Sequence, residues 1–84
     1  GVLEREAIWQ RAFPQKTPTS GLNIKRLAQL NMTGGNIRNI ALNAAFLAAE
    51  AGSPIQMEHL LTATRQEAIK TERPLSENET RGWA

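Results

Sequence analysis

The sequence predicts a small all-α domain, and two observations carry that prediction. Apolar residues recur at helical spacing through most of the 84 residues, and no segment alternates apolar and polar residues as a half-buried strand would. The chain has no cysteine and a single histidine, so neither a disulfide nor a thiolate-bound zinc ion can support so short a chain. We therefore expect one helical bundle, stabilised by close packing or by a partner.

Four helices are expected, a short one near Asn23 and three longer ones over residues 3–12, 34–51 and 57–72. Pro14 ends the first helix, because the residue before a proline is pushed out of the helical region. Asn23 and Thr33 are suitable N-caps for the second and third helices. Gly52 suits the C-terminal end of the third helix.

The third expected helix, residues 34–51, is apolar around most of its circumference. Its polar residues are confined to a narrow stripe formed by Asn36, Asn43 and Glu50. A helix of this kind belongs at the centre of a bundle. The bundle is therefore expected over residues 1–72. Residues 73–84 are polar and contain Pro74, and we expect them to form a flexible tail, although its Trp83 leaves open whether the tail docks.

Composition and missing motifs argue against several functions. The net charge is only +2, and basic and acidic residues are interspersed, whereas a DNA-binding module normally carries a basic stripe. The chain has no aspartate for a Ser-His-Asp triad and no glycine-rich phosphate loop. One histidine with scattered glutamates does not form a metal site. No apolar run reaches the roughly 18 residues of a membrane span, and no signal peptide is visible, so a cytoplasmic location is expected.

The start of the third helix is the most informative segment. Gly34 and Gly35 cost helix stability, about 1 kcal/mol each relative to alanine. They become useful where a ligand or another backbone must come close. Arg38 follows in the same part of the helix, where a cation is usually unfavourable and an anion is favoured. Arg38 thus suits an anion such as a nucleotide phosphate, although the residues alone also allow a loose helix start with a solvated arginine.

The tetrapeptide Gly-Asn-Ile-Arg at residues 35–38 resembles the sensor-2 region in the helical lid of AAA+ ATPases, where the arginine contacts the terminal phosphates. Residues 39–49 resemble the lid helix of the classic AAA branch, the unfoldases and membrane proteases. Those relatives usually open this helix with Ser-Gly-Ala-Asp and have a small residue where this chain has Arg38. The similarity extends over about residues 4–70, including the first helix around Trp9 and the last helix from Ile55 to Glu67.

The resemblance implies a lid subdomain over residues 1–72 that covers ATP and moves with hydrolysis. The implied nucleotide-binding residues are Gly34, Gly35, Asn36 and Arg38, with Arg38 as the phosphate contact. The phosphate loop and the ligands of Mg²⁺ would lie in an upstream domain, so these residues hold no catalytic group and only the parent protein would hydrolyse ATP. The implied partners are that upstream domain and the neighbouring subunits of a ring, usually a hexamer.

The alternative is a free-standing helical module that binds a protein or nucleic acid. The third helix is too apolar for a recognition helix, which exposes polar and basic side chains to base edges. Glu50 in its polar stripe would repel phosphate. His59 is expected at the rim of the bundle, partly exposed and without a catalytic part.

Overall fold

The computed structural model describes residues 1–14 and 16–83, and within them it contains five α-helices and no strand. The helices are α1 (Val2–Ala12), α2 (Ile24–Gln29), α3 (Gly34–Ala51), α4 (Met57–Lys70) and α5 (Glu77–Thr80). The all-α class is confirmed, and α1 to α4 lie where the sequence predicts them. The short helix α5 was not expected.

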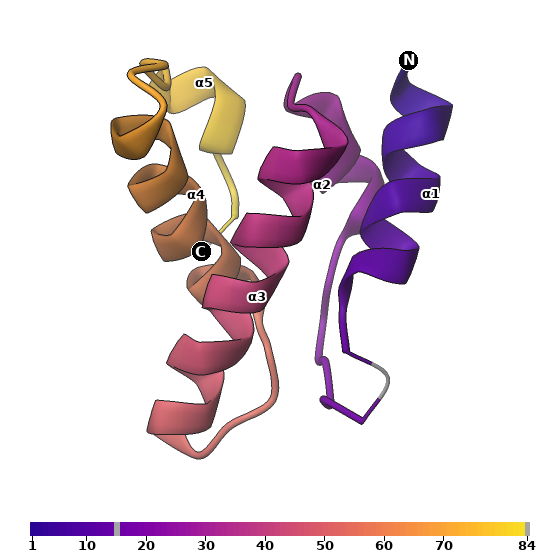
Figure 1. Cartoon of the computed structure of the whole chain (residues 1–84), viewed down its shortest axis with the longest axis vertical. Helices are drawn as coiled ribbons and strands as arrows, with labels where there is room; N and C mark the ends of the chain where they lie inside the picture. Colours follow the sequence, from indigo (N-terminus) through magenta and orange to yellow (C-terminus); the bar gives the residue numbers. More distant parts are fainter. Residues whose placement is uncertain (15, 84) are drawn as a thin grey trace.

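Helix α3 lies between α1 and α4, and α2 packs beside α1 (Figure 1). The loop after α1 runs next to the turn between α3 and α4. There Ile55 donates its N–H to the carbonyl of Pro18 over 2.9 Å, and Ser20 donates to the carbonyl of Ile55 over 2.9 Å. These two hydrogen bonds tie the α1–α2 half of the chain to the α3–α4 half.

The central position predicted for α3 is confirmed, but its apolar surface is not buried all round. Its buried residues are Ile37, Ile40, Ala41, Ala44 and Ala48. Leu42 and Phe46 lie one turn apart on another face and are 51% and 62% exposed. Neighbouring helices cover only part of the circumference, which leaves this apolar pair open to solvent.

Both long helices of the second half end in a left-handed residue. Gly52 has φ 65° after α3, and Glu72 has φ 57° after α4. At the end of α4, Arg73 donates its N–H to Ala68 over 2.9 Å and Glu72 donates to Ile69 over 3.2 Å, which is the hydrogen-bond pattern of a Schellman motif. Glycine adopts this conformation freely, whereas Glu72 adopts it under strain.

The expectation of a flexible tail differs from the structure, which packs residues 73–83 against the helices. Trp83 is 1% exposed and belongs to the hydrophobic core cluster. The guanidinium of Arg26 on α2 donates to the carbonyl oxygen of Arg81. The polar composition of the tail hid this docking, because one large aromatic side chain buries enough apolar surface to anchor a polar segment.

The close packing of α3 predicts that a larger side chain at Ala44, which is fully buried, will not fit. Ala44→Phe should lower the free energy of unfolding by about 1–3 kcal/mol, measured by chemical denaturation. Ala49→Phe is the matched control, since Ala49 lies on an exposed part of the same helix. Equal stability of the two variants would contradict the central position of α3.

The strained turn after α4 predicts a stabilising substitution. Glu72→Gly should raise the free energy of unfolding by about 0.5–1 kcal/mol, because relief of the left-handed strain outweighs the entropy that glycine adds to the unfolded chain. Glu72→Ala keeps the strain and should not stabilise the protein. A gain with alanine as large as that with glycine would rule out backbone strain as the cause.

Candidate functional site

The start of α3 is a well-formed helix end. Thr33 is the N-cap, and its hydroxyl oxygen accepts the backbone N–H of Asn36 over 3.1 Å. The side-chain oxygen of Asn36 accepts the hydroxyl of Thr33 over 2.7 Å and its backbone N–H over 3.4 Å. This reciprocal capping box satisfies part of the helix end and fixes where the helix begins.

Gly34 and Gly35 are predicted to bind nucleotide, and the fold itself does not require glycine at either position. A Cβ added at Gly34 would lie 3.6 Å from the Cδ1 atom of Ile8, and one at Gly35 would lie 3.8 Å from the Thr33 hydroxyl oxygen. Both are ordinary contacts, and neither glycine has a positive φ. Within residues 1–14 and 16–83, the backbone N–H groups of Gly34 and Gly35 also have no hydrogen-bond acceptor. The helix therefore begins with two backbone N–H groups that have no acceptor among the described residues, and no side chain at either residue shields them.

Arg38 is exposed on the same part of α3. Among the described residues its guanidinium forms no hydrogen bond and no ion pair. The positive end of the helix dipole and this unneutralised guanidinium make the start of α3 favourable for an anion. Of the four predicted nucleotide-binding residues, the structure leaves Gly34, Gly35 and Arg38 available to a ligand.

The fourth predicted residue, Asn36, is turned toward α4 instead. Its amide nitrogen donates to the Oε2 atom of Glu67 over 2.8 Å, and the amide of Asn39 reaches the same oxygen over 3.4 Å. Glu67 is only 2% exposed. Sequence reasoning gave Glu67 no role, although a signal existed: Glu67 lies seven residues after Leu60 and thus on the buried face of α4.

The position expected for His59 is wrong. His59 is buried, with 8% of its surface exposed, rather than partly exposed at the rim. Its Nδ1 atom accepts the backbone N–H of Gln56 over 3.0 Å. This bond caps the start of α4, so the side chain has a structural task.

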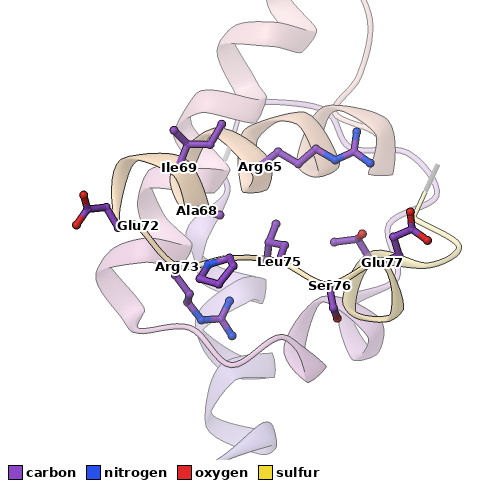
Figure 2. A pocket seen from close by; sticks show the side chains of 10 residues that line it. Arg65, Ala68, Ile69, Glu72, Arg73, Leu75, Ser76 and Glu77 are labelled. Carbon is purple, nitrogen blue, oxygen red and sulfur yellow. The ribbon is translucent and has the colours of Figure 1, made fainter.

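A second surface feature is a groove of about 580 Å³ between the end of α4 and the docked tail (Figure 2). Its apolar lining includes Ala68, Ile69 and Leu75, and Arg65 and Glu77 extend from its edges. The groove includes none of residues 34–38. Sequence reasoning missed it because it exists only when the tail is docked.

No group of three or more His, Cys, Asp or Glu side chains is arranged to hold a metal ion within residues 1–14 and 16–83. No helix in that part of the chain is both long and apolar enough to cross a membrane.

Comparison with known proteins adds no further identification. A scan against models of protein families, a search of curated proteins and a search of solved structures found no match to this chain. The function must therefore be argued from the residues and their geometry.

The docking of the tail is predicted to weaken in acid. The backbone N–H of Ser76 donates to Glu79 over 3.0 Å and is the main cause that lowers the pKa of the Glu79 carboxyl below its ordinary 4.5. Burial opposes this shift, whereas the Ser76 hydroxyl and Arg73 add to it. A carboxyl with a lowered pKa stabilises the fold fully above its ordinary pKa, and this contribution is lost as the pH falls through the lowered value.

The indole N–H resonance of Trp83 should therefore shift toward its unfolded position below about pH 4.5, before that of Trp9. Glu79→Gln should remove this early transition, because the side chain no longer titrates. Glu77→Gln is the matched control on the same helix and should keep it. A Trp83 resonance that follows Trp9 at every pH would contradict a local role for Glu79.

Proposed function

We propose that this chain is the helical lid subdomain of an AAA-type ATPase, and that Arg38 contacts a phosphate of the bound ATP. The observation that carries the proposal is the exposed guanidinium of Arg38, unpaired among the described residues, on a residue three and four positions after Gly35 and Gly34, whose backbone N–H groups have no acceptor there. A guanidinium and backbone N–H groups are the donors that phosphate oxygens accept most strongly. The resemblance of residues 35–38 to a sensor-2 motif gives the same assignment.

The residues at this site fit a phosphate group but not a magnesium ion. The described part of the chain offers no acidic cluster that could ligate Mg²⁺. The ion, the phosphate loop and the groups that activate water would come from an upstream nucleotide-binding domain. The lid would contribute binding and charge stabilisation, because an arginine near developing phosphate charge can accelerate phosphoryl transfer.

The proposed mechanism couples this contact to motion. When ATP is bound, Arg38 would be drawn to its phosphates and the lid would close on the upstream domain. After hydrolysis the contact weakens and the lid is released, so a local charge-assisted bond biases a hinge between two bodies. Because α3 packs against both α1 and α4, a force on its first turn acts on the whole lid. Neighbouring subunits of a ring, a hexamer in the usual arrangement, would receive this motion.

A free-standing protein-interaction module is the second candidate. The observation that favours it is the exposed apolar pair Leu42 and Phe46, together with Ile69, which is 78% exposed in the groove. Apolar patches on a small domain often mark contact sites. A lid would use the same surfaces against its upstream domain or a neighbouring subunit. The response to nucleotide separates the two candidates, because an interaction module has no reason to respond.

The proposal predicts that Arg38→Ala in the native gene product lowers kcat/KM for ATP by about tenfold to a hundredfold, the value of one charge-assisted hydrogen bond. The melting temperature should remain unchanged, because Arg38 is exposed and forms no hydrogen bond or ion pair within the described residues. Steady-state ATP hydrolysis and ATP titration measure the effect.

Arg11→Ala is the matched control, since Arg11 is an exposed arginine on α1 that also forms no side-chain hydrogen bond among the described residues. It should leave hydrolysis unchanged. Equal turnover and equal ATP affinity in the Arg38 and Arg11 variants would refute the phosphate contact. A gene product that neither binds nor hydrolyses ATP would leave the interaction module as the better proposal.

A further inference from the structure

A buried carboxylate joins the start of α3 to α4. The Oε2 atom of Glu67 accepts the amide of Asn36 over 2.8 Å and that of Asn39 over 3.4 Å. Glu67 is 2% exposed, whereas most glutamates of the chain lie at the surface. The arrangement needs an explanation, because a carboxylate taken out of water is costly unless other groups compensate it.

The hydrogen bonds that compensate the buried Glu67 carboxylate come from side chains of α3. The other carboxylate oxygen, Oε1, has no hydrogen-bond partner among the described residues. The Nζ atom of Lys70 lies 3.8 Å from this Oε1 atom. The Lys70 side chain is 68% exposed, so solvent screens the pair and the lysine is a weak partner. The hydroxyl of Thr64, also buried, has no recorded partner either. Among the described residues, Asn36 thus makes the one short hydrogen bond that this carboxylate receives.

The side-chain amide of Asn36 connects the capping box of α3 to Glu67 on α4. Its oxygen closes the capping box with Thr33, and its nitrogen donates to Glu67. Rotation of the amide would break both connections at once. The orientation of Asn36, and with it the first turn of α3, is therefore set from α4. Arg38 follows two positions later on the same turn of backbone.

We infer that Glu67 is a positioning residue, which through Asn36 holds the first turn of α3 in place and so determines how Arg38 meets the phosphate. The identity of that ligand rests on the proposed function, whereas the tie between Glu67 and the helix start rests on the hydrogen bonds alone. Glu67 touches no reacting group in this arrangement. Its effect passes through the orientation of the helix start.

The hydrogen bond between the side chains of residues 36 and 67 requires one amide and one carboxylate. Asn36→Asp would place two carboxylates in contact, although aspartate ordinarily suits the start of a helix. Glu67→Gln retains an oxygen that can accept from Asn36 and should be the milder change. The exchanged pair, Asn36→Asp with Glu67→Gln, restores an amide and a carboxylate with reversed roles. It should recover much of what Asn36→Asp loses.

The first test is hydrogen exchange of the 84-residue chain, which measures without any ligand whether Glu67 holds the start of α3. Glu67→Leu should accelerate exchange of the backbone amides in residues 36–39 by about tenfold or more, relative to amides near the end of α3, because the local opening becomes easier. Lys70→Gln is the matched control and should change neither region. Acceleration that is equal along all of α3 would mean general destabilisation and would overturn the positioning role. Should Glu67→Leu not fold, Glu67→Gln and the exchanged pair give the same comparison.

The second test is ATP hydrolysis by the native gene product. Glu67→Gln and Glu67→Leu should lower kcat/KM, the second by about tenfold or more, since small displacements of a binding group cost large factors in rate. In the Arg38→Ala background, Glu67→Leu should cause little further loss, because both changes remove the same contact. Independent, multiplied losses would overturn the inference.

The two proposals fail in distinguishable ways. Unchanged ATP kinetics in Arg38→Ala would refute the phosphate contact, and hydrogen exchange would still decide whether Glu67 holds the helix start. A normal exchange pattern in Glu67→Leu, with reduced activity in Arg38→Ala, would refute the positioning role alone. Failure of the exchanged pair to recover either readout, while Asn36→Asp is impaired, would also refute it.

Discussion

The packing of α3 between its neighbours is the constraint on which the rest of the structure depends. Ala41 and Ala44 on this helix are fully buried, and Ala48 is nearly so, which lets α1 and α4 approach its axis closely. A small chain without disulfides has few other means of excluding water from a core. Helix α3 contacts both α1 and α4, and Glu67 on α4 accepts the side-chain amide of Asn36 in its first turn. A helix start that is placed by such contacts is a suitable position for a binding group.

Two charged residues use the start of α3 in opposite ways. Glu67 is buried and accepts side-chain amides at one of its two oxygens, whereas Arg38 is exposed and unpaired among the described residues. A buried charge with specific partners fixes geometry, and an exposed charge without partners is free to meet a ligand. The combination of a held helix start and a free guanidinium is what the proposed phosphate contact requires.

The tail changes the surface of the bundle more than its core. Residues 73–83 pack against the helices, because Trp83 is buried in the core and Arg81 accepts a hydrogen bond from Arg26 on α2. The same segment creates the groove beside Ile69 (Figure 2). In the proposed lid, this face and the exposed pair Leu42 and Phe46 are the surfaces open to the upstream domain and to neighbouring subunits.

The sequence by itself determined the helical class, the positions of α1 to α4 and the caps of α2 and α3, because these follow from local periodicity and from residues such as Asn23, Thr33 and Gly52 that act within one turn. It also predicted Arg38 and the two glycines as candidate ligand contacts, because their residue types are unusual at a helix start. Only the tertiary structure decided the burial of His59 and Glu67, the direction of Asn36 and the docking of Trp83. The burial, the Asn36–Glu67 hydrogen bond and the docking of Trp83 depend on how segments distant in the chain pack together, and helix spacing alone indicates only that Glu67 shares a face with Leu60, not which partner it meets.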